Sequence, residues 1–153
     1  MVFLLAFLIG LFGGLRSLTA PAVTAGAAYL GWLKLHSPLA WMSSVVTVGL
    51  FSLLALGELV ADKLPKTPSR TAPPGLIARV VMGALCGACI AMAGDQGIVI
   101  GAILGVVGAL VGCLGGYQIR KRLVAALGTP DYVVALVEDV IAIGGSLWVV
   151  SRF

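Results

Sequence analysis

The sequence predicts an all-α, polytopic membrane protein, and three observations carry that prediction. Of the 153 residues, 60% are hydrophobic and only 10% are charged, whereas a soluble domain carries about 25% charged residues. Several apolar stretches approach the roughly twenty residues that a transmembrane helix needs. These stretches are continuous rather than alternating, which disfavours a β-barrel. We therefore expect a single integral membrane domain over residues 1–153, with no soluble module.

Five apolar segments are expected to form the membrane helices. They cover residues 2–33, 39–62, 76–93, 97–118 and 132–151. A straight helix over the first segment would be about 48 Å long, but the bilayer hydrocarbon is only about 30 Å thick. We expect that segment to break near Gly13, Gly14 and Pro21, because glycine tolerates unusual backbone angles and proline lacks a donor. The first segment has no basic N-terminal region and no convincing cleavage site, so we expect it to stay in the protein and not to be removed as a signal peptide.

Prolines mark the turns between the later segments. Ser37-Pro38 precedes the second segment, and Thr129-Pro130-Asp131 precedes the fifth, where Asp131 suits a helix N-terminus. The connection over residues 63–74 contains four prolines and cannot be a regular helix.

The distribution of Lys and Arg predicts the topology. With five spans, seven basic residues fall on one side: Lys63, Lys66, Arg70, Arg79, Arg120, Lys121 and Arg122. Lys34 and Arg152 fall on the other. Because basic residues gather on the cytoplasmic side, we expect the N-terminus inside and the C-terminus outside. A re-entrant first segment would change where the N-terminus lies.

Glycines recur every four residues in the third and fourth segments. The series are Gly83 and Gly87, then Gly97, Gly101 and Gly105, then Gly108, Gly112 and Gly116. This spacing is typical of a glycine zipper, in which helix backbones approach closely. The zippers either pack within one chain or form a homodimer.

A short internal similarity suggests an inverted repeat. Residues 10–16 (Gly-Leu-Phe-Gly-Gly-Leu-Arg) resemble residues 112–118 (Gly-Cys-Leu-Gly-Gly-Tyr-Gln). The halves would be residues 1–64 and 97–153, joined by the proline-rich loop 65–75 and the helix 76–93. An odd number of spans between them would give them opposite orientations. One feature argues against this repeat. Glu58 and Glu138 both fall toward the inside of the membrane, whereas the two members of an inverted pair would lie on opposite sides.

Arg16, Ser17 and Thr19 surround the expected break before Pro21. Ser17 or Thr19 could cap the helix that Pro21 begins. A helix N-terminus inside a membrane attracts an anion or a carboxylate. Arg16 would therefore either hold an anionic substrate or neutralise Glu58 or Glu138, and both interpretations stay open.

Two acidic pairs fall near the membrane interior. Glu58 and Asp62 share a helix face. They either form an ordinary helix end at the water interface or bind a cation, proton or metal ion. Glu138 and Asp139 lie about two turns into the fifth segment and point about 100° apart. They form either a buried ion pair or a substrate or proton site, with Arg16, Arg79 and the 120–122 cluster as candidate partners.

The remaining polar groups are less informative. Arg120 and Arg122 indicate topology and contact with lipid headgroups, with phosphate recognition as the minority interpretation. Cys86, Cys89 and Cys113 are interpreted as packing residues, although a metal or redox pair is an alternative. We expect no cofactor and no nucleic-acid partner, and the identity of any metal stays open.

Several of these motifs together resemble a known family. They are Gly-Leu-Arg-Ser-Leu-Thr-Ala-Pro at 14–21, Gly-Glu-Leu-Val-Ala-Asp-Lys-Leu-Pro at 57–65, Thr-Pro-Ser-Arg-Thr at 67–71, Pro74, Arg79, Gly-Gly-Tyr at 115–117, Arg120, Arg122, Pro-Asp at 130–131 and Glu-Asp at 138–139. The set is similar to the small bacterial membrane proteins catalogued as domain of unknown function 4126. The resemblance implies a bacterial inner-membrane protein and brings no activity or substrate with it.

Three functions fit the sequence. The first is a small transporter or channel-like protein whose polar pathway is lined by Arg16, Ser17, Thr19, Glu58, Asp62, Glu138 and Asp139. The second is a membrane enzyme or binding protein acting on a phosphorylated lipid. The third is a structural protein that organises lipids. Because no catalytic residue set is present, an enzyme is the less favoured class.

Overall fold

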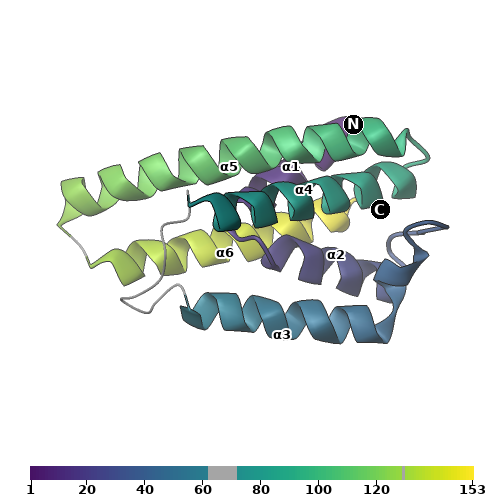
Figure 1. The fold of residues 1–153 in the computed structure, drawn as a ribbon, viewed down its shortest axis with the longest axis horizontal. Helices are drawn as coiled ribbons and strands as arrows, with labels where there is room; N and C mark the ends of the chain where they lie inside the picture. Colours follow the sequence, from purple (N-terminus) through teal and green to yellow (C-terminus); the bar gives the residue numbers. More distant parts are fainter. Residues whose placement is uncertain (62–71, 129) are drawn as a thin grey trace.

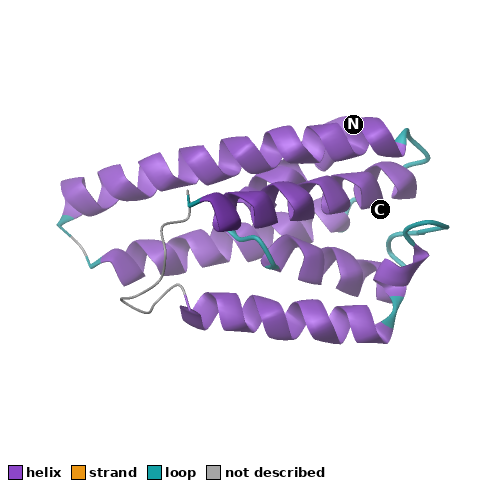
Figure 2. Ribbon diagram, viewed as in Figure 1, coloured by secondary structure: helices purple, strands orange, loops and turns teal. Residues whose placement is uncertain are grey.

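The computed structural model describes residues 1–61, 72–128 and 130–153, and every regular element in these ranges is helical (Figure 2). The elements are α1 (Val2–Leu15), α2 (Thr19–Tyr29), a short 3₁₀ helix η1 (Ala40–Ser43), α3 (Val45–Ala61), α4 (Pro73–Ala93), α5 (Ile98–Leu127) and α6 (Asp131–Val150). The predicted all-α class is confirmed.

The chain reverses direction between α1 and α2 instead of crossing the bundle (Figure 1). Helices α1, α3 and α5 run one way, and α2, α4 and α6 run the other. As a result, both termini lie at one end of the bundle, which we call the terminal end. The opposite end, which we call the basic end, is where α5 finishes with Arg120, Lys121 and Arg122. The prediction of termini on opposite sides required the first segment to cross, so it does not match this arrangement.

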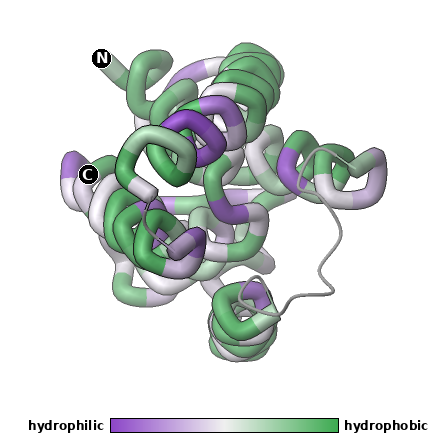
Figure 3. The backbone as a smooth tube through the Cα atoms, turned by 90° about the vertical axis from the view of Figure 1, so that its left-hand side faces the viewer, coloured by the Kyte–Doolittle hydropathy of each residue, from purple (hydrophilic) through white to green (hydrophobic). Residues whose placement is uncertain are grey.

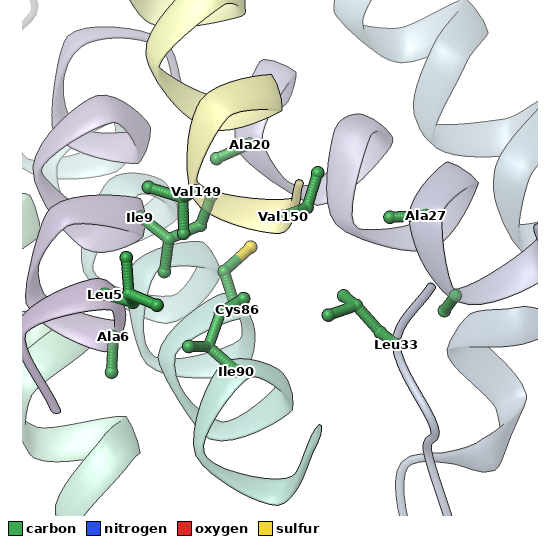
Figure 4. Close-up of a cluster of buried hydrophobic side chains, with 11 residues drawn as sticks. Leu5, Ala6, Ile9, Ala20, Ala27, Leu33, Cys86, Ile90, Val149 and Val150 are labelled. Carbon is green, nitrogen blue, oxygen red and sulfur yellow. The ribbon is translucent and has the colours of Figure 1, made fainter. Parts of the chain in front are cut away.

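A buried apolar cluster holds the terminal end together (Figure 4). It joins Leu5 and Ile9 of α1 to Ala27 near the end of α2, and adds Ile90 of α4 and Val149 of α6. All five side chains are less than 5% exposed. Because the start of α1 and the end of α2 share this cluster, the reversal is built into the core.

Helix α5 packs against α1 and α4 through glycines. A Cβ atom added to Gly105 would overlap the backbone oxygen of Gly83, and one added to Gly10 would overlap the backbone of Gly105. Small residues at such positions let helix backbones touch, where dispersion and Cα–H···O contacts stabilise the pair. These close approaches lie within one chain.

The contacts between α1 and α5 also give their relative direction. Gly10 lies against Gly105, and Gly14 lies against Ala109 and Cys113 further along α5. The two helices therefore run parallel. The sequence similarity between residues 10–16 and 112–118 falls on these two helices, and an inverted repeat would require them to be antiparallel. That expectation is not met, because the shared glycines reflect packing between the two segments.

Several predicted boundaries are wrong for identifiable reasons. Gly13 and Gly14 are not the break but lie in the last turn of α1, since Gly14 allows α5 to approach. Pro73 and Pro74 belong to the first turn of α4, where their missing donors cost nothing.

The second and fourth predicted segments also differ from the helices observed. Residues 40–43 form η1, so α3 begins only at Val45. Helix α5 continues nine residues beyond the predicted end at 118, because charged residues with good helix propensity extend it. It ends at Gly128, whose φ of +60° is the left-handed conformation that glycine adopts easily.

The described helices suit an apolar surrounding. Helices α4, α5 and α6 are long and apolar enough to cross a membrane, whereas α1 and α3 are shorter apolar helices. Viewed from the basic end, most of the chain is hydrophobic and the hydrophilic stretches are few (Figure 3). Many large apolar side chains face outward, such as Val46, Leu53 and Val140, each more than 70% exposed. Such a surface is compatible with a membrane location.

Candidate functional site

The polar site is built around the break between α1 and α2. Helix α1 ends with a hydrogen bond from the Arg16 backbone N–H to Phe12 O, at 3.1 Å. Arg16 itself is extended, with φ −138° and ψ 115°, and α2 begins at Thr19 after the N-cap residue Leu18. Because the first amides of a helix have no partner within it, the break presents donors inside the bundle.

Glu58 of α3 occupies these donors. Its Oε1 accepts hydrogen bonds from the Ser17 backbone N–H at 2.9 Å and from Ser17 Oγ at 2.6 Å. Its Oε2 accepts one from the Leu18 backbone N–H at 2.9 Å. The carboxylate thus caps the start of α2, where the helix dipole also favours negative charge.

This geometry corrects the capping hypothesis. We expected Ser17 or Thr19 to cap α2, but no side-chain cap from α2 itself is present. Ser17 donates to Glu58 instead. The Thr19 hydroxyl is buried and makes no hydrogen bond with any part of the chain that the structure describes. A carboxylate from another helix replaces a hydroxyl cap because it satisfies two amides at once.

Arg79 of α4 lies beside the same carboxylate. Its Nη2 is 3.9 Å from Glu58 Oε1, and its Nη1 donates to Gly75 O at 3.1 Å. Arg79 is only 4% exposed. From the sequence we placed it at the loop and as a candidate partner of Glu138 and Asp139, so its role beside Glu58 was missed. The available signal was its position six residues inside a helix that begins at Pro73.

Arg16 is fully buried and forms an ion pair with Asp139 of α6, through Nη2 and Oδ1. The Asp139 side chain is 9% exposed. Two charges this deep in a protein are tolerated because each offsets the desolvation of the other. The structure pairs Arg16 with Asp139, one of the two carboxylates for which Arg16 was a candidate partner.

Glu138 points to a different helix, as the 100° offset predicts. Its Oε2 is 3.4 Å from Arg120 Nη1 on α5. The same guanidinium binds Asp131, with Nε 2.7 Å from Oδ1. Arg120 therefore joins α5 to two carboxylates of α6, while Lys121 and Arg122 next to it are exposed.

We call Arg16, Glu58, Arg79, Glu138 and Asp139 the polar layer. Arg79 lies six residues after the start of α4, and Asp139 lies eight residues after the start of α6. At about 1.5 Å per residue, these positions are about 9 and 12 Å from the helix ends. The layer is thus displaced from the middle of the bundle toward the basic end.

A cavity of about 310 Å³ adjoins the polar layer between α1, α5 and α6. Among the described residues that line it, Glu138 is the one ionisable residue, and the others are glycine or apolar, including Leu15, Ile119 and Val137. Glu138 contributes only apolar atoms to the cavity surface, while its carboxylate is near Arg120.

Other candidate residues stay outside this arrangement. Asp62 lies outside the described residues. Cys86, Cys89 and Cys113 are buried and form no disulfide. Within residues 1–61, 72–128 and 130–153, no group of three or more His, Cys, Asp or Glu side chains is placed to hold a metal ion.

Comparison with protein families assigns the chain to a family. Comparisons with curated proteins and with solved structures find no match. A family model described as domain of unknown function (DUF4126) matches residues 3–151. This match covers nearly the whole chain, including every described residue of the polar layer. The chain therefore belongs to the DUF4126 family.

Proposed function

We propose that this protein is a small transporter or channel-like protein of the bacterial inner membrane, with the polar layer as part of its pathway. One observation carries the proposal. A helix pair breaks and reverses inside an apolar bundle, and the break lies among buried charged side chains. Discontinuous helices that present their ends to charged groups near the membrane midplane are characteristic of transporters, and charged residues at such depth mark functional sites.

In this proposal four helices cross the bilayer and α1–α2 enters and returns. Helix α3, with 17 residues, is at the lower limit of a spanning helix of about 17–25 residues, and α4, α5 and α6 are longer. The re-entrant pair then brings both termini to the same side. Since basic residues favour the cytoplasm, the basic end faces inward and both termini face outward, which revises the orientation expected for the N-terminus.

The chemistry of the layer favours protons or small cations. Its three carboxylates, Glu58, Glu138 and Asp139, are close to the guanidinium groups of Arg16, Arg79 and Arg120. Because the opposite charges nearly cancel, a single added proton or cation changes the net charge of the layer. An arginine can then release one carboxylate and form an ion pair with another.

Buried hydroxyls suggest where a pathway would continue. Ser146 lies seven residues after Asp139, two turns further toward the terminal end on the same face of α6. The Ser146 hydroxyl is fully buried, and neither it nor the Thr19 hydroxyl makes a hydrogen bond with the described part of the chain. Buried polar groups normally have partners, often ordered water, so these two positions support a hydrated track.

The test is flux through proteoliposomes, read with an entrapped pH dye and with Na⁺ and K⁺ indicators. We expect Glu58→Gln and Glu138→Gln each to lower flux by at least about tenfold, because each removes an ionisable carboxylate without changing side-chain size. Asp95→Asn is the matched control, since it makes the same carboxylate-to-amide change in the connection between α4 and α5, outside the polar layer. Normal flux in both layer variants would refute the pathway.

A structural role is the second candidate, and one observation favours it. Every carboxylate of the layer already has a partner within the protein. If the charges serve only to hold helices together, the double variant Arg16→Gln/Asp139→Asn should restore stability and leave all other properties unchanged. No flux above that of empty liposomes in the wild-type protein would favour the structural role. Flux that is present in the wild type and lost in a folded double variant would favour the pathway.

A further inference from the structure

An open groove lies between α5 and α6. Both helices pack against α1 but make few contacts with each other. The cavity of about 310 Å³ described above fills the gap, with Leu11 and Leu15 of α1 among its lining residues. It opens to the surface, because lining residues such as Ile119 and Val137 are 61% and 56% exposed. Its volume falls at the lower end of the range of small-molecule sites, about 300–1,000 Å³.

The lining suits a hydrocarbon chain rather than a solute. Apart from Glu138, whose carboxylate is near Arg120, every lining residue within the described part of the chain is apolar or glycine. Along α5 the lining runs from Val111 to Leu123, about 18 Å at the helical rise. One leaflet contributes about half of the hydrocarbon thickness of about 30 Å, so the groove matches the depth of a single leaflet.

The groove has a positive end. Lys121 and Arg122 are exposed at the basic end of α5 and form no ion pair with any described residue. Arg122 lies three residues after Ile119, which lines the groove, so the two side chains are neighbours on the helix surface. Arg120 is already engaged by Asp131 and Glu138. The two exposed charges are therefore available to an external anion.

We propose that this groove binds one acyl chain of an anionic phospholipid from the leaflet at the basic end, with its phosphate beside Arg122 and with the neighbouring Lys121 adding positive charge at the same end of the helix. The apolar lining selects the chain, and the two cations select the charge of the headgroup. Neither basic residue belongs to the polar layer, and Glu138 is the one described residue that the groove shares with that layer. A second copy of the chain in the groove is an alternative occupant, and the experiment below separates the two.

The experiment is native mass spectrometry of the protein in mild detergent, titrated with phosphatidylglycerol or with phosphatidylcholine of identical acyl chains. We expect one tightly bound phosphatidylglycerol per chain. Gly115→Leu should weaken that binding by about tenfold or more. Gly115 lines the groove and a Cβ there meets no atom within 4 Å, so the added side chain fills the groove without a backbone clash. Gly144→Leu is the matched control on α6, since Gly144 is equally open but does not line the groove.

A charge variant tests the headgroup separately and does not depend on whether Gly115→Leu folds. We expect Lys121→Gln/Arg122→Gln to lower the preference for phosphatidylglycerol over phosphatidylcholine by about 30-fold. Arg152→Gln, at the terminal end, should leave that preference unchanged. Equal binding of the two lipids by the wild type, or unchanged binding in a folded Gly115→Leu variant, would overturn the proposal. A lipid-free dimer that Gly115→Leu converts to a monomer would overturn it in favour of a second copy.

Discussion

Helices α5 and α3 are attached to the bundle in contrasting ways. Helix α5 lies along α1 and α4, with backbone touching backbone at glycines such as Gly105. Helix α3 packs chiefly against α2 and η1, and only Thr47, Phe51 and Ala55 of its residues are buried. Near its end, α3 is held by the Glu58 carboxylate at the start of α2.

The difference separates a close-packed scaffold from a unit with few buried contacts. Contacts among α1, α4 and α5 depend on shape, and they cannot loosen gradually because interiors are close-packed. The contact between α3 and α2 depends strongly on one ionisable side chain, whose hydrogen bonds change with its charge. Elements with few buried contacts open at lower free energy. If part of this molecule moves during function, we expect it to be α2 with α3.

The largest expected effect comes from Arg16, where the scaffold helix α1 turns into α2. Arg16→Gln removes the guanidinium that pairs with Asp139, and we expect it to lower the free energy of unfolding by about 3–5 kcal/mol. Denaturant unfolding in mixed micelles would measure this. The double variant Arg16→Gln/Asp139→Asn should recover a large part of the loss, because no uncompensated charge stays buried. A single variant as stable as the wild type would show that the pair contributes nothing.

The scaffold itself is tested by Gly105→Ala. The added methyl group meets backbone atoms of Gly83 and Gly87, so we expect a loss of about 1–3 kcal/mol from overpacking. The unfolding should stay cooperative and involve α1, α4 and α5 together. Gly144→Ala, at an open helical position, should instead be neutral or stabilising by up to about 1 kcal/mol. Equal effects of the two changes would contradict close packing at Gly105.

The contact of α3 is tested by Glu58→Gln. Glutamine keeps one acceptor oxygen, so we expect a loss of about 1–2 kcal/mol, mostly local. Hydrogen exchange at the Ser17 and Leu18 amides and along α3 should become faster, while α5 keeps its protection. Asp95→Asn serves as the control. Faster exchange throughout α5 would mean that α3 belongs to the same cooperative unit as the scaffold.

The smallest expected effect is that of Gly57→Ala. Gly57 is exposed within α3, and a Cβ there meets no atom within 4 Å. We expect a gain of up to about 1 kcal/mol in the stability of α3, because alanine loses less backbone entropy than glycine. Slower exchange confined to α3 would indicate that this helix opens separately. Slower exchange in every helix would argue against two units.

Part of the polar site could be predicted from the sequence. Arg16, Glu58, Glu138 and Asp139 stand out because a charge within an apolar run is costly and needs a partner. Which partner each of these charged residues contacts could not be predicted from the sequence. Arg16 could pair with any of several carboxylates, and only the packing of α6 against α1 brings Asp139 to it. Arg79 was missed as a site residue because it lies near the loop in sequence.

The role of the glycines was predicted more accurately than their position in the first segment. Regular spacing in α4 and α5 indicated close helix packing, and the backbone approaches at Gly83 and Gly105 follow that expectation. Gly13 and Gly14 were taken as a break because glycine tolerates both helical and non-helical backbone. Without the neighbouring helix, nothing distinguishes a glycine that ends a helix from one that allows another helix to approach.

By itself, the sequence determined that this protein is helical, apolar and interrupted early by a buried arginine, because composition and hydrophobic run length act locally along the chain. The tertiary structure alone decided that the first segment turns back, that both termini share one end, and that Glu58 caps α2. Those features depend on which distant helix supplies the apolar surface for α2 and the acceptor for its amides. Such pairings are set by the sum of many weak contacts across the bundle, and no single stretch of sequence contains them.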